Sequence, residues 1–203
     1  MKADQTPLPK ILVLASGSGT NLQALIDASR ERDSPGQIIA VGCNQAGAFA
    51  LERAAQANIE TFVVNHKNFE SRDEFDASLM AEILRYNPDL IVLAGFMRIL
   101  TTDFVRAFRG KMLNIHPSLL PKYKGLDTHA RAIEAGDDEA GCSVHEVTAE
   151  LDGGPILGQA RVPILPGDTP DDLAARVLPM EHRLYPAVLA RFATGDRTPV
   201  VLP

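Results

Sequence analysis

The chain has 203 residues, a net charge of −6 at pH 7 and 45% hydrophobic residues. No apolar run in the sequence reaches the roughly 18 residues that a membrane-spanning helix needs. The acidic balance argues against a binder of nucleic acid or of anionic membranes, because their affinity comes from excess positive charge. It leaves open a small anionic ligand, which needs only a few local donors. We therefore expect small-molecule substrates and neither nucleic acid nor membrane as a partner.

The cysteine count and the N-terminal sequence point to a reducing compartment. Cys43 and Cys142 are too few for a disulfide framework, and no second pair completes a zinc site. The opening residues, MKADQTPLPK, are polar and lack the apolar core of a signal peptide. We expect a cytoplasmic protein without a metal. The length fits one large domain, which we expect to span residues 1–203.

In the first half of the chain, short apolar runs alternate with amphipathic stretches. The apolar runs predict strands at 10–15, 38–44, 60–64, 89–96 and 112–115. The amphipathic stretches predict helices at 20–32, 46–57 and 71–86, the last with a capping-box pair at Ser71 and Glu74. This alternation is typical of βαβ units and predicts an α/β fold, a doubly wound and mostly parallel sheet.

The pattern changes after Pro117. A loop rich in proline and glycine at 118–126 precedes a short helix at 128–135. Two antiparallel strands are expected at 141–148 and 158–164, joined through the Asp-Gly-Gly-Pro sequence at 152–155. A closing helix at 169–191 starts with Thr169 as its N-cap. Two prolines lie inside this helix and should kink or break it, Pro179 and Pro186.

In an open parallel sheet, ligands bind beyond the carboxyl ends of the strands. By this rule, the candidate ligand-binding segments are residues 16–21, 95–100 and 114–117. The glycine-rich turn Ser16-Gly-Ser-Gly-Thr-Asn21 opens a helix, so its amides could hold a phosphate, or it could be a tight turn that binds nothing. The bulky residues at 96–100 could line an apolar pocket or belong to the core.

The segment Asn114-Ile115-His116-Pro117 carries most of the chemistry. Asn114 and His116 are two residues apart in a strand, so both side chains face the same way. An imidazole can move a proton at neutral pH, and an amide can stabilise an oxyanion. The alternative is a structural histidine beside a proline turn. Asp152 is either a hairpin-turn residue or a carboxylate partner of His116.

The remaining candidate groups are weaker. Four histidines lack the spacing of metal ligands and are expected to be solvated or hydrogen-bonded: His66, His129, His145 and His182. Neither a Gly-x-Ser-x-Gly motif nor a cysteine in a nucleophile setting is present, so in a transferase the nucleophile would belong to the substrate. Three lysines form at most a local anion rim: Lys111, Lys122 and Lys124.

These segments closely resemble the folate-dependent phosphoribosylglycinamide formyltransferases. The resemblance rests on ASGSGTNLQALI at 15–26, DLIVLAGFMRIL at 89–100, KMLNIHPSLLPKYKGLDTH at 111–129 and ELDGGPILGQARVPI at 150–164. It implies a Rossmann-like formyltransferase fold. It also implies transfer of a formyl group from 10-formyltetrahydrofolate, as co-substrate, to the amine of glycinamide ribonucleotide, by a monomer or homodimer.

The resemblance also implies roles for single residues. His116 would be the acid/base group, Asp152 its carboxylate partner and Asn114 the donor to the formyl oxygen. The ribonucleotide phosphate would bind Gly19, Thr20 and Asn21, and its ribose Glu181. The residues framing the folate would be Arg72, Met97, Arg98, Ile99 and Leu100, together with Asn114.

Two departures and three rival functions accompany the resemblance. Lys124 and Asp127 stand where bacterial members of the family often have proline and histidine, so the loop at 123–129 is left without an assigned role.

Formyltetrahydrofolate hydrolase, with water as the acceptor, is the nearest alternative, but it usually has an extra N-terminal domain. Methionyl-tRNA formyltransferase needs a further domain and a basic surface. A binding module without activity would not need Asn114, His116 and Asp152 together.

Overall fold

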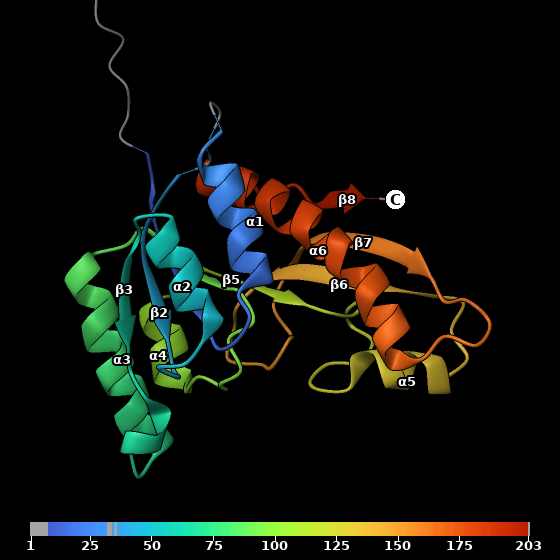
Figure 1. Cartoon of the computed structure of the whole chain (residues 1–203), viewed down its shortest axis with the longest axis horizontal. Coiled ribbons are helices and arrows are strands. Elements are labelled where there is room, and N and C mark those ends of the chain that lie inside the picture. The colour runs from blue at the N-terminus through green and yellow to red at the C-terminus, as the bar shows by residue number, and fades with distance from the viewer. Residues whose placement is uncertain (1–7, 32–33, 35, 203) are drawn as a thin grey trace, which may run out of the picture.

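The computed structural model describes residues 8–31, 34 and 36–202, and Figure 1 shows their arrangement around a single sheet. Within these residues the strands follow the order β3-β2-β1-β4-β5-β6-β7-β8. The pairs from β3 to β5 are parallel, β6 is antiparallel to both neighbours, and β8 is parallel to β7. The strands are β1 (Lys10–Ala15), β2 (Gln37–Cys43), β3 (Glu60–Val63), β4 (Leu90–Leu93), β5 (Met112–His116), β6 (Glu139–Glu146), β7 (Ile156–Pro163) and β8 (Val200–Leu202). The predicted fold class, doubly wound with an antiparallel C-terminal portion, is confirmed.

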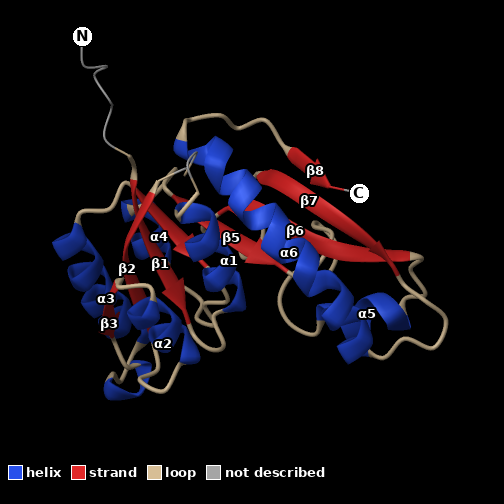
Figure 2. Cartoon of the chain, turned by 45° about the horizontal axis from the view of Figure 1, so that its top comes forward, coloured by secondary structure: helices blue, strands red, loops and turns tan. Residues whose placement is uncertain are grey.

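Helices cover both faces of the sheet and bury two separate apolar clusters (Figure 2). The larger cluster lies between one face and the helices α1, α2, α5 and α6, and the smaller lies under α3 and α4. None of the described helices has the length and apolar character to cross a membrane. The helices are α1 (Thr20–Ser29), α2 (Phe49–Gln56), α3 (Arg72–Tyr86), α4 (Thr102–Ala107), α5 (Thr128–Glu134) and α6 (Pro170–Ala193), with a 3-10 turn at His66–Asn68.

The alternation of side chains along β5 and β6 creates the polar face of the sheet. Leu113 and Ile115 belong to the cluster under α6, so Asn114 and His116 point to the opposite face. On that face the smaller cluster reaches no further along β5 than Met112. The register pairs Asn114 with His145 and His116 with Ser143. Four polar side chains therefore share one face of two adjacent strands.

Several element boundaries differ from the prediction. The first helix ends at Ser29, and its expected end at position 32 lies outside the described residues. β4 ends at Leu93 instead of continuing to residue 96, because Gly95 has a φ of 72°, which no extended strand allows. At the start of α3, the Ser71 hydroxyl accepts from the Glu74 N–H, but the Glu74 carboxylate accepts from the N–H of Glu70, so only half of the capping box forms.

The expected break in the closing helix is wrong. α6 continues through Pro179 and Pro186 for 24 residues. A proline inside a helix costs about 3 kcal/mol, because a backbone hydrogen bond is lost and the ring crowds the preceding turn. Val177, Leu184 and Val188 are each at most 2% exposed, and burying such a side chain contributes roughly 1.5–3 kcal/mol. Burial of this face therefore offsets the local cost of both prolines.

Tyr185 ties α6 to the centre of the sheet. Its ring is fully buried, and its hydroxyl lies 2.9 Å from the Leu93 carbonyl and 3.1 Å from the Leu113 carbonyl. These carbonyls belong to β4 and β5, which lie beside each other in the sheet. Burial holds the pKa of the Tyr185 hydroxyl well above its usual range, so the group stays a donor.

We predict that Tyr185→Phe lowers the free energy of unfolding by about 1–3 kcal/mol, because two buried carbonyls lose their side-chain donor. The measurement is urea unfolding followed by circular dichroism. Tyr86→Phe is the matched control, because the Tyr86 hydroxyl donates to Glu60 at the surface, and it should cost less than about 0.5 kcal/mol. Equal losses in the two variants would contradict the prediction.

Candidate active site

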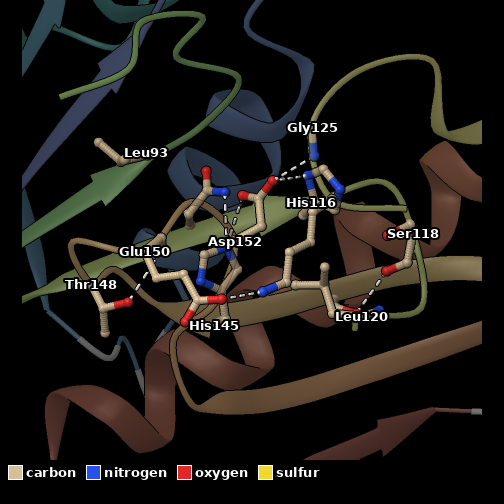
Figure 3. A network of polar contacts seen from close by, with 12 residues as sticks. Leu93, His116, Ser118, Leu120, Gly125, His145, Thr148, Glu150 and Asp152 are labelled. Carbon is tan, nitrogen blue, oxygen red and sulfur yellow. Dashed lines mark hydrogen bonds and ion pairs between the residues drawn. The ribbon is translucent and has the colours of Figure 1, made fainter. Parts of the chain in front are cut away.

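A buried carboxylate lies between two histidines at the end of the polar face (Figure 3). Asp152 Oδ2 is 3.5 Å from His116 Nδ1, and Asp152 Oδ1 is 3.5 Å from His145 Nε2. The Gly125 N–H donates to Oδ2 at 2.9 Å. The His116 and Asp152 side chains are each 8% exposed. The structure therefore brings Asp152 and His116 together and supports the reading of Asp152 as a carboxylate partner, although it also lies in a turn with a φ of 48°.

Both ring nitrogens of His116 face hydrogen-bond acceptors. Nε2 lies 2.9 Å from the Tyr123 carbonyl oxygen, while Nδ1 faces the Asp152 carboxylate. A carbonyl and an ionised carboxylate can only accept, so a ring protonated at both nitrogens satisfies both contacts. The surroundings of His116 thus suit the imidazolium form, which can donate a proton or stabilise a negative charge.

Asn114 is oriented by His145. The Asn114 amide nitrogen lies 3.1 Å from His145 Nε2, and His145 Nδ1 lies 3.0 Å from the Glu146 carbonyl. In the neutral ring with its proton on Nδ1, Nε2 accepts from the amide, and in the protonated ring it donates to Asp152. When the ring is neutral, one hydrogen of the Asn114 NH₂ group is donated to His145 and the other is free to be donated to a ligand.

The pKa of Asp152 reflects these neighbours. Burial by itself raises the pKa of this carboxyl group. The hydrogen bonds from His145 and from the Gly125 N–H, together with the charges of both imidazoles, oppose burial and lower the pKa below its usual value. Asp152 is therefore ionised at neutral pH and lies between the two rings as an acceptor.

His145 is the site residue that sequence reasoning missed. It was expected to be solvated or hydrogen-bonded, and the structure places it 2% exposed between Asn114 and Asp152. A period-2 pattern could have placed it on the same face as Ser143, but nothing in the sequence states which residue of β5 it meets. Among the other histidines, His66 binds Asn44, and burial followed by the charge of His116 lowers the pKa of His129.

The glycine-rich turn after β1 has the geometry of an anion site. Gly19 precedes α1 with a φ of 69°, and a Cβ there would meet Ala50 at 2.8 Å, so only glycine fits. The turn is fixed from α2, because the Arg53 Nε–H donates to the Ser18 carbonyl at 2.8 Å. Thr20 opens the helix, so the first amides of α1 are free to donate.

Glu181 reaches the same turn from α6. Its carboxylate accepts a 2.7 Å hydrogen bond from the Asn21 amide, and both residues are buried. Burial raises the pKa of Glu181, against the opposing effect of the Asn21 hydrogen bond. The Asn21 amide oxygen is buried without a partner among the described residues. The predicted substrate group of Gly19, Thr20, Asn21 and Glu181 is therefore assembled in one place.

The loop after β4 presents apolar side chains beside the polar cluster. Met97 is 64% exposed and Ile99 54% exposed, while Leu100 packs against the core and Arg98 lies 5.7 Å from the centre of the Phe75 ring. Leu93, at the end of β4, is the register partner of Asn114. The loop therefore starts beside the polar cluster.

Two backbone contacts hold this loop. The Met97 N–H donates to the Ser16 hydroxyl, and the Thr101 N–H donates to the buried carboxylate of Asp76. Arg72 lies exposed one turn before Asp76 on α3. Exposed apolar groups on a fixed backbone suit a flat apolar ligand, and Arg98 Nε is buried without a partner among the described residues.

The cysteines and the acidic residues offer no second centre in the described chain. Cys43 and Cys142 are free and buried, and burial raises the pKa of the Cys43 thiol to about 11 and that of Cys142 further. Across residues 8–31, 34 and 36–202, no group of three or more His, Cys, Asp and Glu side chains is placed to hold a metal ion.

A turn with the geometry of an anion site, a buried carboxylate between two histidines and an exposed apolar loop suit an enzyme that transfers a group between two substrates, and known proteins agree with this class. The formyl transferase family model matches residues 9–189, and the chain belongs to this family. Within the family, it is 55% identical over 91% of its length to the phosphoribosylglycinamide formyltransferase of Escherichia coli strain K12, covering 87% of that protein. It is 50% identical over 93% of its length to the enzyme of that name from Haemophilus influenzae, covering 89% of it. The phosphoribosylglycinamide formyltransferase structure from Coxiella burnetii superposes with a TM-score of 0.89 at 47% identity, covering 98% of this chain and all of that one.

The low pKa of Asp152 predicts an acid-dependent contribution to stability. A carboxyl group whose pKa is lower in the folded state stabilises the fold above its unfolded pKa, and this contribution is lost as the pH falls through the folded value. We expect Asp152→Asn to be less stable than the parent at pH 6, with the difference shrinking below about pH 4. Urea titrations between pH 3 and 6 measure it. Asp103→Asn, at a carboxylate that is 91% exposed, is the control, and a difference for Asp152→Asn that does not vary with pH would contradict the prediction.

Proposed function

We propose that this chain transfers the formyl group of 10-formyltetrahydrofolate to the amine of N1-(5-phosphoribosyl)glycinamide. The products are formylglycinamide ribonucleotide and tetrahydrofolate, and the reaction is a step of purine biosynthesis. The observation that carries the proposal is the buried cluster of Asn114, His116 and Asp152 at the carboxyl end of β5, in a chain that is 55% identical to an enzyme of this name.

In this reaction the substrate amine attacks the formyl carbon and a tetrahedral intermediate forms. The free hydrogen of the Asn114 amide and the protonated His116 ring stabilise its oxyanion. His116 then moves protons as the folate amine leaves, while the ionised Asp152 beside Nδ1 holds the ring in place. Because the nucleophile belongs to the substrate, the buried cysteines have no part in the chemistry.

The two substrates occupy the two sides of this cluster. The ribonucleotide phosphate accepts from the amides of Gly19, Thr20 and Asn21, and Glu181 accepts from the ribose hydroxyls. Met97, Ile99 and Leu100 line the folate ring, and Arg72 and Arg98 offer donors to its polar groups. Holding two reactants in a reactive geometry can supply roughly 7–11 kcal/mol of the barrier reduction. We further propose a single domain that acts in the cytoplasm as a monomer or homodimer.

Hydrolysis of the same folate, with water as the acceptor, is the alternative. Its chemistry needs the same acid/base cluster but no binding site for a ribonucleotide. The Asn21–Glu181 pair and the turn at Gly19 support a second, anionic substrate instead. The names of the relatives also favour transfer to the ribonucleotide over hydrolysis.

We predict that the formyl folate loses its formyl group only when the ribonucleotide is present, and that His116→Ala lowers kcat at least ~100-fold. A spectrophotometric assay of the folate measures both effects. The matched control is His66→Ala, because His66 lies after β3 and bonds to Asn44, and its rate should stay within about twofold of the parent. Deformylation without ribonucleotide would establish the hydrolase instead, and near-normal rates for His116→Ala would exclude its catalytic role.

We predict that Gly19→Ala raises the KM for the ribonucleotide at least ~10-fold, because the added Cβ displaces the turn whose amides hold the phosphate. The KM for the formyl folate should stay unchanged. Gly167→Ala is the matched control, since Gly167 also has a positive φ, 85°, but its Cβ would meet nothing within 4 Å. With an acceptor that lacks the phosphate, Gly19→Ala and the parent should perform alike, and an equal penalty there would remove the phosphate from this turn.

A further inference from the structure

The loop at residues 123–129 touches the acid/base cluster through its backbone. The Tyr123 carbonyl lies 2.9 Å from His116 Nε2, and the Gly125 N–H donates to Asp152 at 2.9 Å. Lys124 lies between these two residues in the chain, so the position of its backbone affects both contacts. Any displacement of the loop at this residue therefore moves a partner of His116 and a partner of Asp152 together.

Lys124 binds the segment that carries Asp152. Its Nζ lies 2.7 Å from Glu150 Oε1, and Glu150 is two residues before Asp152 (Figure 3). Two links thus join this loop to the segment that carries Asp152: the hydrogen bond from the Gly125 N–H to Asp152 and this ion pair. The Tyr123 carbonyl ties the same loop to His116 on β5. The Lys124 side chain is 34% exposed and the Glu150 side chain 70% exposed, so the pair is partly solvated.

The Glu150 side chain packs against the turn that follows it. A Cβ at Gly153 would meet Cγ, Cδ and Oε2 of Glu150 at 2.3–2.6 Å, so the Glu150 side chain lies against the bare backbone of Gly153. The Gly153 N–H also donates to the Glu150 carbonyl at 3.2 Å, and the Thr148 hydroxyl donates to the same carbonyl at 3.3 Å. The Glu150 backbone is therefore held by two hydrogen bonds, and its carboxylate is held by Lys124.

α5 holds the other side of the loop. The Arg131 guanidinium donates to the carbonyls of Lys124 at 2.7 Å and of Leu126 at 3.2 Å, and lies 5.3 Å from the centre of the Tyr123 ring. Asp127 is exposed at the N-cap of α5, and its side chain makes no cap hydrogen bond. The loop is thus anchored to α5 by Arg131 and to the Asp152 segment by Lys124.

We propose that Lys124 and Glu150 are positioning residues for the formyl transfer, and that their ion pair sets the distance between the Tyr123–Gly125 backbone and Asp152. This inference rests on the proposed function, because it assigns the pair a role in that reaction. Neither side chain needs to contact a substrate for this role. The pair acts through the Gly125 N–H on Asp152 and through the Tyr123 carbonyl on His116.

Charge reversal tests the proposal. Lys124→Glu and Glu150→Lys each replace attraction by repulsion, and we expect each to lower kcat about three- to tenfold, as suits a partly exposed pair. The double variant restores the attraction with reversed polarity, and we expect its kcat to return to within about twofold of the parent. The KM for the ribonucleotide should not change, because the pair is separate from the turn at Gly19.

Arg161→Glu is the matched control. Arg161 and Glu139 form an ion pair of similar length, 2.9 Å, and their side chains are 49% and 54% exposed. This pair links β6 to β7 and does not involve the loop whose backbone contacts His116 and Asp152. This reversal should leave kcat within about twofold of the parent. A loss there equal to that of Lys124→Glu would overturn the proposal, because the effect would then follow from any surface reversal.

A second measurement does not depend on activity. Amide hydrogen exchange of Gly125, followed by NMR, should be faster in both single reversals and return toward the parent rate in the double variant. If the parent protein fails to transfer the formyl group while this pattern holds, the proposed function fails and the placement of the loop stands. Provided that the parent enzyme is active, two results would overturn the positioning role. One is an unchanged kcat in the single reversals, and the other is a kcat of the double variant that is no higher than that of either single variant.

Discussion

The candidate site depends on how the protein accommodates one buried carboxylate, Asp152. Burying an ionised carboxylate is unfavourable unless donors compensate it. The compensating groups come from three separate segments: His116 from β5, His145 from β6 and the Gly125 N–H from the loop between them. The strand register, the path of that loop and the turn at Asp152 must all be correct at once. The same requirement places two imidazole rings on either side of the carboxylate, each 3.5 Å from one of its oxygens.

The site exists because the sheet extends further than the helices that cover one of its faces. α6 lies across β6 and β7 on one side (Figure 2). On the other side the cluster under α3 and α4 reaches no further along β5 than Met112. The parallel half supplies the anion-binding turn, and the antiparallel extension supplies His145. α6 packs on β6 and β7 and also reaches the parallel half. There Glu181 binds Asn21, and the Tyr185 hydroxyl lies beside the Leu93 carbonyl at the end of β4 and the Leu113 carbonyl near the start of β5.

The sequence predicted local features well and missed the features that depend on a contact with a residue distant in the chain. The apolar runs located β1 to β5, and period-2 alternation placed Asn114 and His116 on one face. The proximity of Asp152 and the role of His145 depend on the antiparallel pairing of β5 with β6, which no hydrophobic pattern specifies. α4 and β8 are too short to give a periodic signal. The prolines of α6 were misjudged because a local rule does not include the burial that outweighs it.

The contact between His116 and Tyr123 bears on how such a site distinguishes the ground state from the transition state. With the ring protonated, Nε2–H donates to a neutral backbone carbonyl. An oxyanion on the formyl carbon is a stronger acceptor than a carbonyl, since hydrogen bonds to charged groups are roughly twice as strong. In the proposed reaction an oxyanion would therefore compete for this N–H only once negative charge has developed, and such differential binding accelerates a reaction. Before that moment the Tyr123 carbonyl is the acceptor at this position, 2.9 Å from Nε2.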